Sequence, residues 1–114
     1  MLILKPGQAL NLWHKAMLAQ VRDDDPDLTT RQMAILLTVY LDPPPHTVRG
    51  LAAQLDVTKP VITRALDTMG IMGLVARRRD ERDRRNVLVQ RTVDGAEYLQ
   101  RLGDLIADEA IETT

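Results

Sequence analysis

Two short helical patterns, separated by only two residues, constrain the fold of this chain more than any other feature of its sequence. The first is VRGLAAQL at residues 48–55, with Thr47 at its N-cap position. The second is KPVITRALDTMGIMG at residues 59–73, which follows the dipeptide DV and has Thr58 at its N-cap position. A break this short makes the second helix turn sharply against the first, so the pair predicts a helix-turn-helix.

The second of these helices has one apolar face and one polar face. Its apolar residues recur at steps of three and four, the period of one helix face, and they are Val61, Ile62, Ala65, Leu66 and Met69. The other face carries Lys59, Thr63, Arg64 and Asp67. We therefore expect the apolar stripe to be buried and the polar face to be open to a ligand.

After Gly73 the pattern changes from helix to strand. The stretches LVARRR and NVLVQRT alternate as strands do, and DERDRR between them predicts a polar hairpin tip. The segment of this hairpin from its first arginine, Arg77, to its last, Arg91, is called the wing below. Helix, helix, turn, helix and two-stranded ribbon is the order of a winged helix-turn-helix. The sequence therefore predicts a mainly α fold with a small β-hairpin wing.

Further helical patterns lie on both sides of this region. The first runs from Gln8 to Arg22, and the next, RQMAILLTVYL, follows a capping box of Thr29 and Gln32 and ends before three prolines. A last pattern covers residues 93–112. We expect one domain over residues 1–114, made of an N-terminal helix (1–25), the winged helix-turn-helix (28–92) and a C-terminal helix (93–112).

Positive charge is concentrated in the winged region. The whole chain has 15 basic and 16 acidic residues and a net charge of −1. Residues 49–91 alone hold ten basic residues (Arg49, Lys59, Arg64 and seven arginines in residues 76–92) and five acids, a net charge of +5. A basic face of this kind suits a polyanion, although an uneven solvated surface has the same composition. A helix fits the major groove of DNA, and an arginine-tipped ribbon fits the electronegative minor groove.

The stretches LTTRQMAILL and LAAQLDVTKPVITRALDTMGIMGLVARRRDERDRRNVLVQRTVDGAEYL resemble the MarR family of bacterial winged-helix transcription regulators, over roughly residues 28–102. The sharpest match is the family's wing pattern D-x-R-D-x-R, reproduced by Asp80, Arg82, Asp83 and Arg85. The resemblance implies that a wing arginine, above all Arg82, enters the minor groove and that Asp83 holds neighbouring arginines in position. It implies a sequence-specific regulator of transcription that binds double-stranded DNA, with repression as its expected mode.

The expected DNA contacts lie on the second helix of the helix-turn-helix and on the wing. Lys59 and Thr58 are placed to bind phosphate at the helix N-terminus, and Arg64 to read a guanine edge. Because successive strand residues alternate in direction, at most two of the arginines at 77–79 face DNA at once. Arg49 is equally compatible with a phosphate contact and with a solvated side chain. The full expected set is Thr58, Lys59, Thr63, Arg64, Arg77, Arg79, Arg82, Arg84 and Arg85, with Asp80 and Asp83 positioning the wing.

The resemblance also implies a homodimer built from helices at both ends of the chain. The residues expected at this interface are Leu10, Trp13, Met17, Leu99, Leu102 and Ile106. We expect the long final helix of the family to be shortened or missing, since the last helical pattern ends near Glu112. That leaves any small-molecule effector unknown. It also leaves open a rival interpretation, a winged-helix interaction module that docks an acidic partner or pairs with another regulator.

Several other classes of function find no support in the sequence. The absence of cysteine excludes disulfides, thiolate metal sites and thiol redox sensing. No phosphate-binding loop, nucleophile elbow or catalytic triad is present, so we expect no enzyme. His14 and His46 are expected to be ordinary histidines, and we expect no obligate cofactor and no metal. No apolar run approaches the roughly twenty residues of a membrane span. A bacterial cytoplasmic protein, associated with the nucleoid when bound to DNA, is the expectation.

Overall fold

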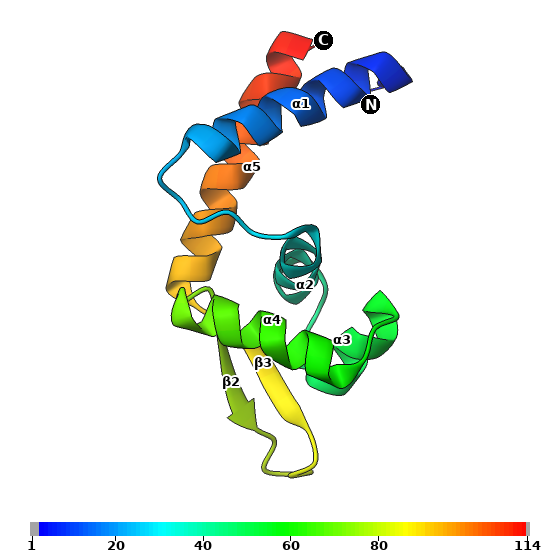
Figure 1. The fold of residues 1–114 in the computed structure, drawn as a ribbon, viewed down its shortest axis with the longest axis vertical. Coiled ribbons are helices and arrows are strands. Elements are labelled where there is room, and N and C mark those ends of the chain that lie inside the picture. The colour runs from blue at the N-terminus through cyan, green and yellow to red at the C-terminus, as the bar shows by residue number, and fades with distance from the viewer. Residues whose placement is uncertain (1–2, 114) are drawn as a thin grey trace. The chain divides into compact units, whose positions relative to one another are not determined.

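The computed structural model describes residues 3–113, and this part of the chain forms five helices and a three-stranded sheet (Figure 1). The elements are α1 (Pro6–Arg22), α2 (Thr30–Leu41), β1 (His46–Thr47), α3 (Val48–Leu55), α4 (Lys59–Ile71), β2 (Val75–Arg79), β3 (Val87–Arg91) and α5 (Val93–Thr113). The mainly helical winged-helix fold predicted from the sequence is confirmed.

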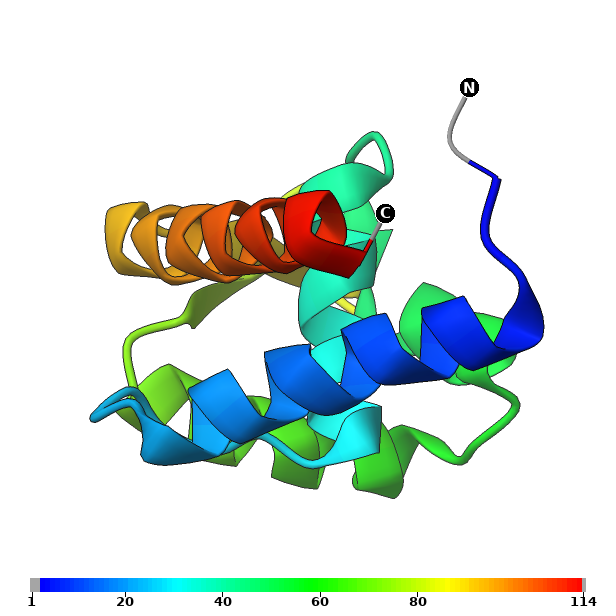
Figure 2. The same cartoon turned by 90° about the horizontal axis from the view of Figure 1, so that it is seen from above.

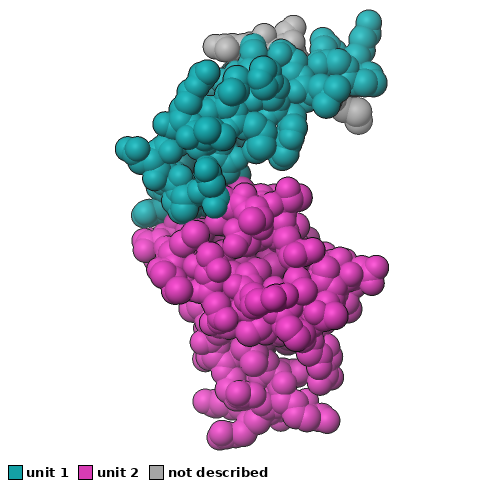
Figure 3. Space-filling model, in the orientation of Figure 1, with its two compact units in different colours: residues 1–27, 97–114 teal, residues 28–96 magenta. Residues whose placement is uncertain are grey.

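The chain divides into two compact units, residues 1–27 with 97–114 (unit 1) and residues 28–96 (unit 2) (Figure 3). The single domain over residues 1–114 stays a prediction.

The helices of unit 2 begin where the sequence places their caps. Thr29 Oγ1 accepts from the Gln32 amide (3.1 Å) and Gln32 Oε1 accepts from the Thr29 amide (2.9 Å), so the predicted capping box starts α2. At the start of α3, Thr47 Oγ1 accepts from the Gly50 amide (2.9 Å). Thr58 occupies the N-cap of α4, as expected, but its side chain accepts no capping hydrogen bond. The Thr58 hydroxyl therefore does not cap the N-terminus of α4.

The core of unit 2 fixes which face of α4 is exposed. Helix α2 is seen end-on in Figure 1 while α4 runs across the picture, so the two helices cross steeply (Figures 1 and 2). The side chains between α2 and α4, with one side chain from α3, form this core, and each is at most 1% exposed. They are Ile35, Leu36 and Val39 of α2, Leu51 of α3, and Ile62, Leu66 and Met69 of α4. The predicted apolar stripe of α4 is thus confirmed, apart from Val61, which is only half-buried. Burial of this stripe turns the polar face of α4 outward.

The sheet contains a strand that the sequence did not reveal. Its order is β1-β3-β2, with β2 and β3 forming the predicted hairpin, in which Val75 pairs with Arg91 and Arg79 with Val87. The hairpin extends beyond α3 and α4 (Figure 1). The added strand β1 pairs antiparallel with β3 through only two residues, which is too short for an alternating pattern to be recognised. It follows directly on the three prolines that end α2.

A part-buried hydrogen-bond network closes unit 2 around Tyr40. Its hydroxyl donates to the Leu74 carbonyl (2.8 Å) and accepts from the Thr92 amide (2.8 Å). Thr92 Oγ1 in turn donates to the Gly73 carbonyl (2.7 Å) and accepts from the Gly95 amide (2.9 Å). The network therefore ties the end of α2 to both ends of the wing.

Unit 1 is held by a small core of its own. Ala16 of α1 and Tyr98 of α5 are at most 3% exposed, and Gln20 Nε2 donates to the Tyr98 hydroxyl (3.2 Å). Burial raises the pKa of Tyr98. A bidentate pair joins Arg101 to Asp25 (3.0 Å for both bonds). Among residues 3–113, no helix is long and apolar enough to cross a membrane.

Helix α1 begins at Pro6, two residues before the predicted start at Gln8. The proline occupies the first turn, where no amide hydrogen is needed. Gln8 Oε1 accepts from the Lys5 amide (2.9 Å) and so caps the helix two residues earlier than the apolar pattern indicated.

Candidate nucleic-acid interface

The outer face of α4 carries the expected cations in an exposed position. Lys59, Thr63 and Arg64 are exposed, and so is Thr58 at the N-terminus of the helix. In the described part of the chain, no acidic side chain forms an ion pair with Lys59 or Arg64. Both cations therefore keep their charge available for a ligand.

The tip of the wing is folded by its two aspartates. Asp80 Oδ1 accepts from the Arg82 amide (2.9 Å), and Asp83 Oδ1 accepts from the Arg85 amide (3.1 Å). Each is a hydrogen bond to the backbone two residues ahead, the geometry of an Asx turn. The carbonyl of Asp83 also accepts from the Asn86 amide (2.9 Å). The acids between the arginines thus shape the backbone from which the arginines project.

Asp83 has a second partner in the side chain of Arg85. The guanidinium donates from Nε to Oδ1 (3.0 Å) and from Nη2 to Oδ2 (3.1 Å). These bonds from the Arg85 side chain, and then the bond from its amide, hold the pKa of Asp83 below its usual value. The carboxylate raises the pKa of Arg85 in return. Asp83 is therefore ionised at neutral pH, and Arg85 is already paired before any ligand arrives.

Two other arginines of the expected set also have partners within the protein. Arg77 Nη2 lies 2.7 Å from Asp67 Oδ1 of α4, and Arg79 Nη1 donates to the Arg84 carbonyl (2.7 Å). The first bond joins the wing to α4, and the second spans the tip.

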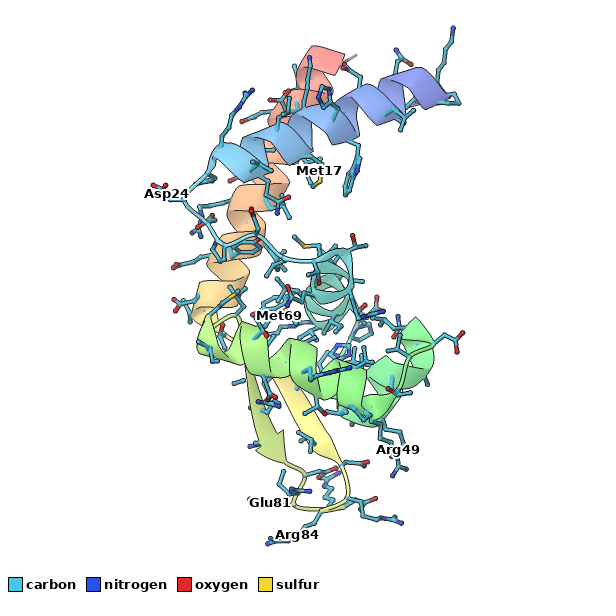
Figure 4. All side chains as sticks on the ribbon, viewed as in Figure 1. Met17, Asp24, Arg49, Met69, Glu81 and Arg84 are labelled. Carbon is cyan, nitrogen blue, oxygen red and sulfur yellow. The ribbon has the colours of Figure 1, made fainter. Side chains whose placement is uncertain are left out.

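The arginines at the tip itself have no such partner. Within residues 3–113, no ion pair or side-chain hydrogen bond engages the guanidinium of Arg82 or Arg84. Figure 4 shows Arg84 and its neighbour Glu81 at the far end of the hairpin. Arg82 and Arg84 are consequently the arginines of the tip most available to a polyanion.

The alternation expected along β2 is confirmed by what its arginines touch. Arg77 reaches Asp67 on α4, whereas Arg78 lines a cavity together with Leu88 and Gln90. Arg79 is two positions from Arg77 and so shares its side of the strand. Arg78, which was not in the expected DNA-binding set, lies on the opposite face of the sheet.

Two further arginines have positions that the sequence left open. Arg49 of α3 is exposed and lies toward the same end of unit 2 as the wing tip (Figure 4). Its positive charge makes a small contribution to the lowered pKa of Asp83. Arg91 has a structural role. It donates from Nε to the Val39 carbonyl (2.8 Å) and from Nη2 to the Asp42 carbonyl (3.0 Å), and its guanidinium lies 5.9 Å from the centre of the Tyr40 ring.

The residues expected at a dimer interface all lie in unit 1 and differ in exposure. Leu10 and Trp13 are 69% and 59% exposed, whereas Met17, Leu99, Leu102 and Ile106 are half-buried. Val21, two turns beyond Trp13, is 68% exposed. An apolar stripe therefore follows an exposed face of α1, beside the buried Ala16.

The histidines and acidic residues of the described chain do not cluster as metal ligands do. Within residues 3–113, no group of three or more His, Asp or Glu side chains is placed to hold a metal ion. His46 Nε2 instead lies 3.1 Å from the Asp42 carbonyl, and His14 is an exposed side chain of α1.

One family model and several solved structures are similar to this chain. A model of the MarR family matches residues 28–87, more than half of the chain. A mutant of MepR from S. aureus is similar in structure, with a TM-score of 0.72, 24% identity, and coverage of 92% of this chain and 74% of that one. The transcriptional regulator BldR from Sulfolobus solfataricus has a TM-score of 0.64 and 26% identity, covering 96% and 84%. The transcriptional regulator Tm0710 from Thermotoga maritima has a TM-score of 0.70 and 20% identity, covering 88% and 68%. The comparison with curated proteins gave no match.

Proposed function

The chain belongs to the MarR family and is a DNA-binding transcription regulator, and we propose that it is a repressor that reads both grooves of its operator. In this proposal α4 enters a major groove and the wing lies in the flanking minor groove. The observation that carries it is the division of the basic residues. Arg64 on α4 and Arg82 and Arg84 at the wing tip have no acidic partner in the described residues, while other arginines are committed to the fold.

On α4, two kinds of contact follow from position. Lys59 and the free hydroxyl of Thr58 lie at the helix N-terminus, where amides and the helix dipole also favour phosphate. Thr63 and Arg64 lie farther along the exposed face, toward the base edges of the groove. The guanidinium of Arg64 matches O6 and N7 of guanine in bidentate geometry. We assign phosphate contacts to the first pair and base reading to the second.

On the wing, the arginines divide into those that shape it and those that contact DNA. Arg77 joins β2 to Asp67 of α4, so it holds the wing in register with the helix that reads the major groove. Arg79 and Arg85 fasten the tip. Arg82 and Arg84 then project from a preformed turn, which lowers the entropy lost when they bind.

We propose that Asp83 positions the arginines of the tip, and a pair of matched substitutions separates this positioning role from the effect of its negative charge on DNA binding. Asp83→Ala and Glu81→Ala both remove one negative charge from the tip, and a purely electrostatic wing would bind DNA more tightly in both cases. We expect Glu81→Ala to strengthen binding several-fold, because Glu81 makes no hydrogen bond or ion pair in the described structure. We expect Asp83→Ala to weaken binding several-fold, because the turn and the Arg85 pair are lost. Fluorescence anisotropy on operator DNA measures both, and tighter binding by Asp83→Ala would refute the positioning role.

We further propose that the regulator is a homodimer, formed through α1 and α5 and bound to two half-sites about one helical turn apart. The exposed stripe of Leu10, Trp13 and Val21 supports this assignment. Sedimentation equilibrium at tens of micromolar should give the dimer mass. Trp13→Glu should shift it to the monomer, whereas Asn11→Glu, at an exposed polar position of the same helix, should not. A monomeric parent protein would refute the proposal.

The experiment that tests the function is fluorescence anisotropy on duplex DNA from the upstream region of the protein's own gene, with a scrambled duplex as control. Tight binding to the native duplex only, with the logarithm of the affinity falling steeply against that of salt concentration, is expected. In vitro transcription from the same DNA should decrease as protein is added. Equal weak binding to both duplexes would favour the interaction module instead. The proposal places the protein in the bacterial cytoplasm, with no obligate cofactor and with its effector unspecified.

A further inference from the structure

The sheet of unit 2 has two edges, which are protected to different degrees. The edge formed by β1 is only two residues long and follows three prolines, which cannot donate to an added strand. The other edge is β2, at the left of the hairpin in Figure 1, since the strand order is β1-β3-β2. It runs for five residues, VARRR, without proline or glycine. Strand β2 therefore presents the longer open edge of this sheet.

The hydrogen-bond pattern shows which main-chain groups of β2 are unused. In an antiparallel ladder, hydrogen-bonded pairs alternate with pairs whose N–H and C=O groups point outward. The Asp80 amide donates to the Asn86 carbonyl (3.0 Å), and the register places the pair of Arg79 and Val87 next to it. The N–H and C=O groups of Arg79, and of Arg77 two residues earlier, therefore point away from β3. Outside the ladder, no hydrogen bond in the described residues engages these main-chain groups.

A groove of about 660 Å³ lies beside this edge. It is lined by three successive residues of β2 and by the C-terminal turns of α4, and these residues are Val75, Ala76, Arg77, Asp67, Gly70 and Ile71. Successive strand residues point to opposite faces of a sheet, so a groove lined by three in a row follows the edge of the strand. An open strand edge beside a groove is the arrangement that receives an extended peptide by β-strand addition.

The charge of β2 restricts which strand is added. Arg77, Arg78 and Arg79 follow one another along the edge, and Asp67 is the one acidic residue among the described residues that line the groove. Asp67 is already paired with Arg77 (2.7 Å), whereas Arg78 has no ion pair in the described structure. Opposite charges on facing strands stabilise their pairing, and like charges destabilise it. A second copy of β2 is therefore repelled, and an acidic strand is attracted.

The groove also has an apolar part. Ile71, the last residue of α4, is 89% exposed and lines the groove together with Val75 and Ala76. An exposed isoleucine offers nothing to a phosphate backbone, but an apolar side chain laid against it removes its surface from water. The groove therefore favours a strand with acidic residues toward the wing tip and apolar residues toward the end of α4.

We propose that the edge of β2 binds an acidic, extended segment of a partner protein, which joins the three-stranded sheet as an additional strand. The main-chain groups of Arg77 and Arg79 bind its backbone, Arg78 binds its carboxylates, and Ile71 packs against its apolar residues. This interaction goes beyond DNA binding. It uses neither the arginine of α4 nor the two unpaired arginines of the wing tip, so it does not depend on the DNA contacts assigned above.

The test uses the peptide acetyl-EETVVL-amide, titrated into the full chain labelled with ¹⁵N and followed by NMR. In an antiparallel alignment its glutamates lie opposite Arg78 and Arg79, and its two valines lie opposite Ala76 and Val75. We expect saturable shifts of the amides of β2 and of the last turn of α4, with slower hydrogen exchange of the Arg77 and Arg79 amides. The absence of saturable shifts would overturn the proposal. So would shifts confined to the wing tip and the N-terminal half of α4, because the peptide would then only replace DNA.

Modified peptides separate strand addition from simple attraction of charge. N-methylation of the threonine and the second valine removes the donors that face β2 in this alignment, and it should weaken binding about tenfold. N-methylation of the second glutamate and the first valine, whose N–H groups point away from β2, should leave the affinity nearly unchanged. The basic peptide acetyl-KKTVVL-amide should bind several-fold more weakly than the acidic one. Equal affinity of the two methylated peptides, or of the acidic and basic peptides, would overturn the proposal.

Variants at Arg77 assign the effect to the main chain of β2. Arg77→Pro and Arg77→Ala both remove the bond to Asp67, but only proline also removes the outward-pointing N–H. Because this N–H takes no part in the ladder with β3, the position is one where a strand edge accepts proline. Peptide binding should be several-fold weaker for Arg77→Pro than for Arg77→Ala. Equal binding by the two folded variants would overturn the proposal. If the amide spectrum shows that Arg77→Pro is unfolded, the two methylated peptides decide the question with the parent protein.

Discussion

Gly95→Ala is expected to lower the free energy of unfolding by about 2–5 kcal/mol, although alanine favours helices more than glycine does. Gly95 is buried in the first turn of α5. A Cβ added there would overlap the Tyr40 hydroxyl and the Leu74 carbonyl, which are hydrogen-bonded to each other. The methyl group therefore forces apart two elements of a packed core.

The cost comes from hydrogen bonds as well as from overlap. Moving the Tyr40 hydroxyl away breaks its bonds to the Leu74 carbonyl and the Thr92 amide, both of which are partly buried. A buried polar group left without a partner costs about 1–3 kcal/mol. Because this network ties α2 to both ends of the wing, we also expect the variant to lose DNA affinity at temperatures where it is still folded.

Gly103→Ala provides the matched control in the same helix. An added Cβ at Gly103 has no atom within 4 Å, and the residue is exposed. This substitution should raise the free energy of unfolding by about 0.5–1 kcal/mol, through helix propensity alone. Urea unfolding monitored by circular dichroism measures both variants. Equal effects at the two positions would contradict the close packing around Gly95.

Features encoded locally were the ones that the sequence predicted well. Helix α2 starts and ends where the Thr29–Gln32 capping box and the three prolines indicate, because caps and prolines act on the backbone next to them. The turn between α3 and α4 needs only a two-residue break, in which Asp56 takes a left-handed conformation (φ 56°, ψ 49°). The apolar stripe of α4 was visible because a helix repeats its faces at a fixed period.

Features that depend on contacts between distant residues were not predictable in the same way. The Tyr40 hydroxyl meets Thr92 across 52 positions, and no periodic pattern records that pairing. For the same reason the basic stretch could be recognised, but its arginines could not be separated into paired and unpaired groups. The Asp67–Arg77 bond requires α4 and β2 to be placed side by side first. The D-x-R-D-x-R pattern drew attention to Asp80 and Asp83, and both accept backbone hydrogen bonds in the tip; their role in positioning arginines for DNA stays a prediction.

The division among the arginines leads to the second large effect, on DNA affinity. Arg82→Ala is expected to weaken binding about tenfold on operator and scrambled DNA alike, and to reduce the salt dependence by about one counterion. The reason is that Arg82 projects from the preformed tip with no partner of its own in the described structure, and that in the proposed complex it lies in the minor groove, where the base edges carry little sequence information.

Arg64→Ala should lose a comparable affinity on the operator, about 1–3 kcal/mol, but only there, because a bidentate contact to a guanine edge exists at one base pair. Its affinity for scrambled DNA should change far less, so the ratio between operator and scrambled DNA falls in this variant and is preserved in Arg82→Ala. Fluorescence anisotropy on both duplexes over a salt series gives the ratio and the slope together. A selective loss for Arg82→Ala, or a uniform one for Arg64→Ala, would exchange the roles assigned to the wing and to α4. An unchanged affinity of Arg82→Ala at moderate salt would instead remove the wing tip from the interface.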